Sequence, residues 1–289
     1  PLGEVAQLPK EKVALAQRVI TMRGKKDLVD NTYLKYLLLA TGGRQGEIFG
    51  TIFQRRPEGV RKYLCRDSGA RQGEIFEAIE PVIPDGRPAL VHGKRIILWG
   101  EFKKRTNNIA QNLLANGIKP GDKIAFYTRN GPEYPEGIAA AFKAGLVHVN
   151  VNYRYIEKEL IYLIDNSDSS VVVYHQEFRE SVNNIKSKLP KVKIWLETVE
   201  GNECTYEKFA TEGDGSSPKI EHSPDDLLFL YTGGTTGMPK GVMWKHDDLF
   251  QVLGAGGNIR MGVPACETLD ELVQRIKTTP RPVNLPLPP

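Results

Sequence analysis

From about residue 73 onward, short apolar runs alternate with longer segments in which apolar residues recur at helical spacing. The short runs predict strands at 123–127, 147–151, 169–174, 191–198 and 226–231, and a hairpin at 88–98. The amphipathic segments predict helices at about 102–114, 134–143, 156–164, 178–189 and 206–211. Strands that alternate with helices are typical of βαβ units. The pattern therefore predicts an α/β fold with a mostly parallel sheet covered by helices on both faces.

The first 72 residues lack this alternation and carry most of the chain's basic character. They hold 14 Lys and Arg against 7 Asp and Glu, whereas the remainder holds 25 against 28. The formal net charge of +4 thus belongs to the front segment. We expect residues 1–72 to be a basic, poorly ordered extension of unknown role, because such a composition offers little burial to offset ordering entropy. Residues 73–289 form the expected domain.

The hexapeptide RQGEIF occurs at 44–49 and again at 71–76. Solenoid folds need three or more repeats of one unit, so a single pair does not predict one. We interpret the pair as a local duplication or a gene-assembly scar and not as a functional repeat.

Several classes of function are excluded by the positions of cysteine and histidine, by the charge and by the hydropathy of the chain. Cys65, Cys204 and Cys266 are scattered without Cys-x-x-Cys spacing and the five histidines are dispersed, so no metal site is expected. The mildly acidic body has no nucleic-acid footprint. No run approaches the roughly 20 apolar residues of a transmembrane segment. We expect a cytoplasmic protein; its oligomeric state stays open.

A glycine-rich loop follows the apolar run 227–231 and reads YTGGTTGMPKGV over 231–242. Glycines let the backbone approach a ligand closely, and successive N–H groups can converge on an anion. Threonine hydroxyls add donors, and Lys240 adds a mobile charge able to follow phosphates. The loop predicts a polyphosphate site made of Thr232, Gly233, Gly234, Thr235, Thr236, Gly237 and Lys240.

Two other nucleotide motifs fit poorly. A Walker loop places Gly directly before Lys, whereas Pro239 precedes Lys240 here. The stretch 254–259 has Ile259 where a dinucleotide fingerprint needs its third glycine. A plain glycine-rich surface turn remains the alternative interpretation of the loop.

The loop closely resembles the phosphate-binding motif of the adenylate-forming (AMP-binding) superfamily, Tyr/Phe-Thr-Ser-Gly-Ser/Thr-Thr-Gly-x-Pro-Lys-Gly-Val. The departure is Gly233, where that family most often has Ser. Segments 142–152, 159–163 and 242–246 are also similar to the family, and the last resembles fatty-acid-type acyl-CoA synthetases. The resemblance covers about 73–289 and implies part of the large N-terminal domain of such an enzyme. His246 is expected to begin a helix and not to act as a base.

The resemblance implies a ligase that uses MgATP to convert a carboxylic acid to acyl-AMP and then to acyl-CoA. ATP, Mg²⁺ and CoA would be its cofactors and substrates. A fatty acid is the expected acid, on Trp244 and general similarity, while amino and aryl acids stay open. The sequence lacks the family's Tyr-Gly-x-Thr-Glu core, so no catalytic residue is assigned and the isolated chain is expected to be an inactive fragment. The alternative is a non-catalytic remnant or binding protein with a basic contact tail.

Overall fold

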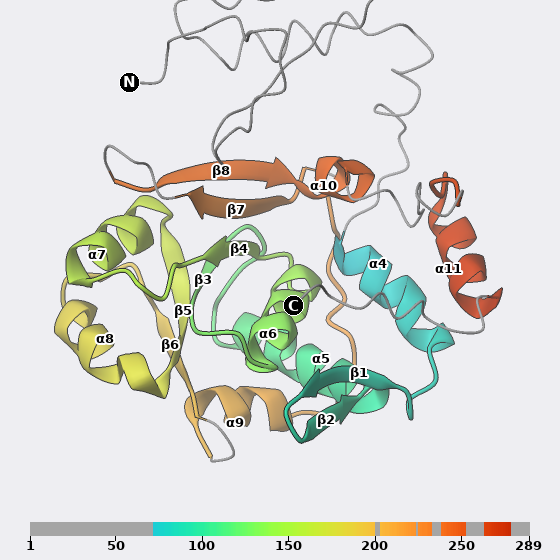
Figure 1. The fold of residues 1–289 in the computed structure, drawn as a ribbon, viewed down its shortest axis with the longest axis horizontal. Helices are drawn as coiled ribbons and strands as arrows, with labels where there is room; N and C mark the ends of the chain where they lie inside the picture. Colours follow the sequence, from blue (N-terminus) through green and yellow to red (C-terminus); the bar gives the residue numbers. More distant parts are fainter. Residues whose placement is uncertain (1–71, 200–202, 224, 233–237, 253–262, 279–289) are drawn as a thin grey trace, which may run out of the picture. The chain divides into compact units, whose positions relative to one another are not determined.

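The centre of the fold is a six-stranded sheet (Figure 1). The computed structural model describes residues 72–199, 203–223, 225–232, 238–252 and 263–278. The strand order is β6–β5–β3–β4–β7–β8. The strands are β3 (Lys123–Tyr127), β4 (Val147–Asn150), β5 (Ser169–His175), β6 (Ile194–Thr198), β7 (Leu227–Thr232) and β8 (Lys240–Lys245). Strands β3 to β7 run parallel and β8 pairs antiparallel with β7. The prediction of a mostly parallel sheet is confirmed.

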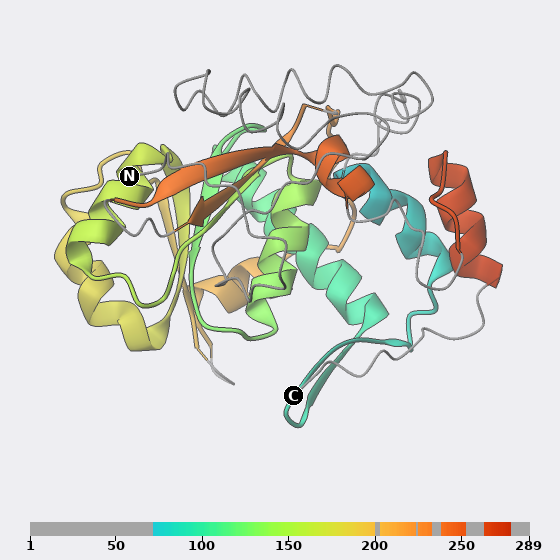
Figure 2. The same cartoon turned by 45° about the horizontal axis from the view of Figure 1, so that its top comes forward.

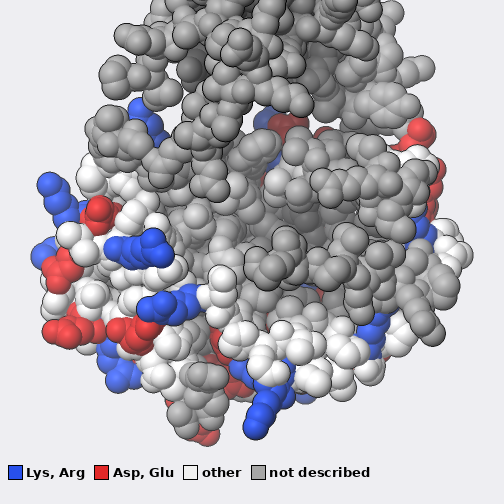
Figure 3. Space-filling view, in the orientation of Figure 1, with Lys and Arg blue, Asp and Glu red and all other residues white. Residues whose placement is uncertain are grey.

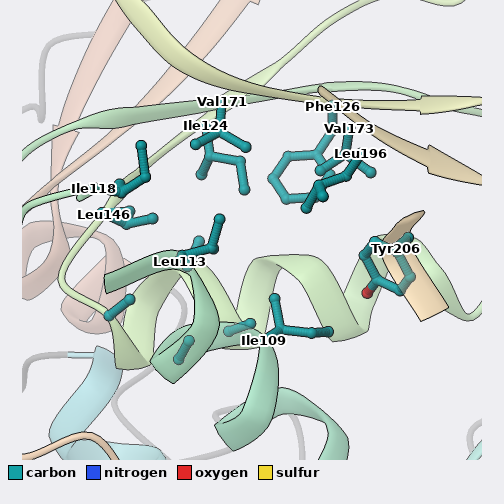
Figure 4. Packing of buried hydrophobic residues seen from close by; sticks show 14 of the residues in the cluster. Ile109, Leu113, Ile118, Ile124, Phe126, Leu146, Val171, Val173, Leu196 and Tyr206 are labelled. Atoms are coloured by element: carbon teal, nitrogen blue, oxygen red, sulfur yellow. The ribbon is translucent and has the colours of Figure 1, made fainter. Parts of the chain in front are cut away.

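Helices cover both faces of the sheet (Figures 1 and 2). One face packs against α5 (Trp99–Ala115), α6 (Glu133–Lys143) and α9 (Thr205–Thr211), and the other against α7 (Glu157–Asn166) and α8 (Arg179–Lys186). Successive strand residues point to opposite faces, so Ile124 and Phe126 join the first core cluster while Ala125 and Tyr127 join the second. Figure 4 shows the first cluster, in which Ile109 and Leu113 of α5 face the strands. This two-sided burial explains the near-continuous apolar strands in the sequence.

A smaller unit precedes the sheet in sequence. It consists of α4 (Gln72–Ile79), the 3-10 turn η1 (Glu80–Val82) and the hairpin β1 (Pro88–His92) with β2 (Arg95–Leu98). Gly93 adopts φ +58° in the hairpin turn, which favours glycine. Phe76 of α4 lies 6.4 Å from the ring of Phe102 on α5. The hairpin predicted at 88–98 is confirmed, whereas α4 was not predicted.

Two buried ionic clusters connect the helices. Arg105 of α5 donates to Glu136 of α6 at 2.7 Å and to Glu207 of α9 at 2.6 Å. Burial opposes its charge, but the hydrogen bonds to Glu207 and Glu136 hold the pKa of Arg105 above its ordinary value. Lys143, at the end of α6, donates to Glu80 of η1. Each cluster joins residues far apart in sequence.

Some predicted boundaries are wrong. The helix expected at 178–189 is a 3-10 turn, η2 (Gln176–Phe178), followed by α8, which ends at Lys186. The ring Nδ1 of His175 accepts the N–H of Glu177 and helps to begin that turn. The strand expected from residue 191 begins at Ile194, because the preceding residues form a turn in which Val192 N–H donates to Leu189 O.

Two further helices lie beyond the sheet strands in sequence, α10 (His246–Val252) and α11 (Leu269–Thr278). Except for Gln72, the front extension lies outside the described residues, as do the first RQGEIF copy and the stretch 254–259. Most of the second copy forms the start of α4. On the face in Figure 3, basic and acidic side chains of the described residues are mixed. None of the helices in this described part has the length and apolarity needed for a membrane span.

Candidate phosphate-binding site

The predicted phosphate loop leaves the sheet at the carboxyl end of β7. In a parallel sheet the carboxyl ends of all strands meet at one edge, and that edge is where α/β folds bind ligands. The ends of β3, β4, β5, β6 and β7 share it here. The strand that leads into the loop therefore ends at the edge where a ligand site is expected.

The loop is closed by the antiparallel pairing of β7 with β8. Thr232, the last residue of β7, is the strand partner of Lys240, the first residue of β8. At the far end of the pair, Leu227 faces Lys245, whose ammonium lies 2.5 Å from the carboxylate of Asp225. The hairpin therefore fixes where both ends of the loop lie.

Tyr231 connects the start of the loop to neighbouring elements. Its N–H donates to Oδ1 of Asn150 on β4 at 2.8 Å, and its hydroxyl donates to Oδ1 of Asn166 on α7 at 2.9 Å. Its strand partner is Gly241, and a Cβ there would lie 2.9 Å from Tyr231 Cζ. Burial raises the pKa of the Tyr231 hydroxyl, so it is a hydrogen-bond donor at neutral pH.

The described residues include only part of the predicted site. Thr232 and Lys240 face each other at the loop's base, and the Lys240 side chain is exposed. Gly233, Gly234, Thr235, Thr236 and Gly237 lie outside the described residues. Asn150, Asn166 and Tyr231 were not predicted as parts of the site. An asparagine at a strand end was the available sequence signal for Asn150, whereas Asn166 lacked one.

Comparison with known proteins identifies the family. The family model described as AMP-binding enzyme matches residues 82–268, which is more than half of the chain. The chain belongs to the family of AMP-binding enzymes. The resemblance first noted in the loop is thus confirmed, and its extent agrees with the match.

Individual relatives of this AMP-binding chain are carboxylate–CoA ligases by name. It is 37% identical to a medium/long-chain-fatty-acid–CoA/3-oxocholest-4-en-26-oate–CoA ligase of Mycolicibacterium smegmatis over 72% of this chain and 39% of that protein. It is 34% identical to the medium-chain acyl-CoA ligase Mig of Mycobacterium avium over 73% and 42% of the two chains. The chain spans about two fifths of the length of these curated relatives.

A solved relative supports the fold assignment. The N-terminal domain of FACL13 from Mycobacterium tuberculosis is 26% identical, with a TM-score of 0.57 over 64% of this chain and 46% of that one. The AMP-binding chain thus has the fold of an N-terminal portion of an acyl-CoA synthetase, as the sequence predicted.

His246 has a structural position in this AMP-binding chain. It is the first residue of α10, and its N–H donates to Asp226 O at 2.8 Å. The ring is buried edge-on against Phe142 at 4.7 Å. Burial lowers the pKa of His246 to about 4, so the ring is neutral at pH 7. These contacts agree with the prediction that His246 begins a helix.

A hollow of about 200 Å³ at the same edge lies near the ends of β3, β5 and β6. Its arginines are already ion-paired, Arg95 with Glu133 at 2.6 Å and Arg129 with Glu177 at 2.5 Å. Because these partners neutralise both guanidinium charges, we assign no anion site there. The phosphate loop stays the candidate site of this AMP-binding chain.

Proposed function

We propose that the protein containing this chain activates a carboxylic acid with ATP and transfers the acyl group to CoA. The observation that carries the proposal is the phosphate-loop sequence between Thr232 and Lys240 at the carboxyl end of β7, in a chain of the AMP-binding family. The names of the two relatives described above, both acyl–CoA ligases, support the same reaction.

The reaction has two displacements. A carboxylate oxygen attacks the α-phosphorus of ATP, an O–P bond forms, and the bond to the β-phosphate breaks to release pyrophosphate. The thiol sulfur of CoA, as its thiolate, then attacks the acyl carbon, and the C–O bond to AMP breaks. Lys240 and the loop N–H groups would hold the β- and γ-phosphates and offset the charge of the departing pyrophosphate, which is catalysis by positioning and electrostatics.

We propose a fatty acid as the acyl donor. Two relatives are named for medium- or long-chain fatty acids, and one of them also for a steroid acid. Trp244 in the segment after the loop agrees with this class. Amino and aryl acids would be tested beside it.

Mg²⁺ would accompany ATP in this reaction. The part of the chain that the structure describes contains no group of three or more His, Cys, Asp or Glu that could hold a metal ion. No step is derived through the ion.

The site is tested by measuring the binding of pyrophosphate and of MgATP to the full chain and to Lys240→Ala, with calorimetry or phosphorus NMR. The variant removes a charge-assisted contact worth about 1.5–3 kcal/mol, so we expect roughly tenfold or greater weakening for both ligands. Lys245→Ala is the matched control, because this lysine lies at the other end of β8 and pairs with Asp225. Equal binding by wild type and Lys240→Ala would refute the site.

A second assay separates catalysis from binding. Acid-dependent ATP–pyrophosphate exchange is measured with short to long fatty acids and an aryl acid. We expect no exchange by the 289-residue chain, because its sequence lacks the Tyr-Gly-x-Thr-Glu core. Polyphosphate binding without exchange would agree with a phosphate-binding portion of a ligase, and exchange above a blank would contradict the expected inactivity.

A further inference from the structure

Tyr231 makes three contacts that converge on the two ends of the phosphate loop. Its backbone bonds to Asn150, its hydroxyl bonds to Asn166, and its ring covers Gly241. Residue 231 directly precedes the loop, and residue 241 directly follows Lys240. One residue, through its backbone and its side chain, thus connects the loop's entrance and exit to β4 and α7.

The Asn150 contact continues the sheet where its regular pairing stops. The last pair between β4 and β7 is Val149 with Phe229. Two residues further along β7, the Asn150 side chain supplies the acceptor for the N–H of Tyr231 at 2.8 Å. The start of the loop is therefore hydrogen-bonded to the sheet beyond the end of the backbone ladder.

The Gly241 contact depends on the absence of a side chain. A Cβ at residue 241 would lie 2.9 Å from Cζ and 3.0 Å from Cε2 of Tyr231, closer than real Cβ contacts allow. Tyr231, which is only 8% exposed, therefore has its ring directly against the backbone that leads out of Lys240. The hydroxyl bond to Asn166 at 2.9 Å fixes the ring's far end.

We infer that Tyr231 and Asn166 are positioning residues for the phosphate loop, with Asn150 holding the adjoining backbone. The hydrogen bond that the Tyr231 hydroxyl donates to Asn166 fixes the ring, the ring fixes the backbone at Gly241, and Lys240 is thereby held opposite Thr232. The inference rests on the proposed polyphosphate site. Preorganisation of this kind improves affinity because less ordering remains to be done when the ligand binds.

The experiment measures pyrophosphate dissociation constants and thermal midpoints for the full chain, Tyr231→Phe, Asn166→Ala and the double variant. Tyr231→Phe keeps the ring against Gly241 and removes only the hydroxyl. We expect each single variant to bind about two- to tenfold more weakly, the effect of one lost hydrogen bond. The double variant should bind no more weakly than the singles, because both changes remove the same bond.

Tyr127→Phe is the matched control. This tyrosine is also buried at the end of a strand and also loses one hydroxyl bond, to Tyr155 O at 3.1 Å, but that bond holds neither end of the loop. We expect a similar change in its thermal midpoint with unchanged pyrophosphate affinity. A purely structural role for Tyr231 would instead give the two tyrosine variants the same affinity.

The outcomes separate this inference from the proposed function. If the wild-type chain binds pyrophosphate and Tyr231→Phe and Asn166→Ala bind equally well, the positioning role is wrong and the site remains. Additive losses in the double variant would also refute it, since the residues would then act independently. If the wild-type chain binds no pyrophosphate, the site and its positioning residues are both refuted.

Discussion

The buried charge between α6 and η1 allows a quantitative test of how the helices are held together. Lys143 and Glu80 are both essentially inaccessible to solvent. The three protons of the Lys143 ammonium meet three acceptors, the Glu80 carboxylate, Thr106 Oγ1 at 2.7 Å and Asn107 Oδ1 at 2.7 Å. Burial raises the pKa of Glu80 and lowers that of Lys143, so both charged forms depend on each other.

Glu80→Gln keeps the shape of the side chain but leaves the ammonium buried without a counter-charge. Breaking a buried pair in this way costs about 3–5 kcal/mol. That loss is a large share of the total of about 5–15 kcal/mol by which folded domains are stable. Urea unfolding, monitored by tryptophan fluorescence, measures the difference in the free energy of unfolding between the variant and the wild-type chain. A double variant, Glu80→Leu with Lys143→Met, should lose less than Glu80→Gln, because no unpaired charge is then buried.

The matched control is Asp225→Asn, which removes the carboxylate from an exposed pair with Lys245. Exposed pairs contribute about 0–1 kcal/mol, so this change should be close to neutral. The reasoning fails if Glu80→Gln destabilises the chain by less than about 1 kcal/mol, or no more than the exposed control does. Either result would mean that Lys143 loses its charge or reaches solvent at little cost.

Two further predictions concern the core. Burial lowers the pKa values of His148 and His246 to about 4, below the ordinary 6.5, so as the pH falls the unfolded chain binds protons at these histidines before the folded chain does. The free energy of unfolding should therefore fall by about 2 kcal/mol per histidine between pH 7 and pH 5. Urea unfolding at each pH measures this change, and an unchanged free energy of unfolding over that interval would contradict the prediction. Gly137→Ala in α6 should destabilise the chain by about 1–3 kcal/mol in thermal or urea unfolding, despite alanine's higher helix propensity, because the new Cβ would lie 2.3 Å from Phe126 Cε1. In the control Gly86→Ala the new Cβ meets no atom within 4 Å, so that change should be nearly neutral. Equal effects of the two substitutions would refute the packing argument.

The parallel part of the sheet was predictable because both of its faces are buried. Every residue of a strand such as Val171–Tyr174 then has to be apolar, and the run is visible without any structural information. The edge strand β8 was missed for the opposite reason. Most of its side chains are exposed, so no alternation of apolar and polar residues marks it.

Helix α4 was missed because long-range contacts determine its position. Phe76 packs against Phe102, and the turn that follows begins with Glu80, which contacts Lys143. Eight residues without these partners are too short to predict a helix from local pattern.

The candidate site likewise has a part that the sequence could predict and a part that it could not. A single continuous segment encodes the phosphate loop, so its glycines, threonines and Lys240 could be read from the sequence. Its supports could not, because Asn150 and Asn166 precede Tyr231 by 81 and 65 residues. Only the folded sheet brings a strand-end asparagine and a helix-end asparagine to one tyrosine.

Thr232 and Lys240 are partners across the β7–β8 hairpin, and this pairing bears on how long the loop between them can be. Folding of β7 against β8 already closes the chain into a ring, and the entropy of ring closure grows only with the logarithm of its size. Doubling the seven residues 233–239 would add about 0.6 kcal/mol. The sheet could therefore accommodate a longer connection at little cost. In the proposed phosphate site, a longer loop would not keep its N–H groups aimed at one phosphate, so under that proposal the ligand, and not the fold, constrains how many residues lie between the two strands.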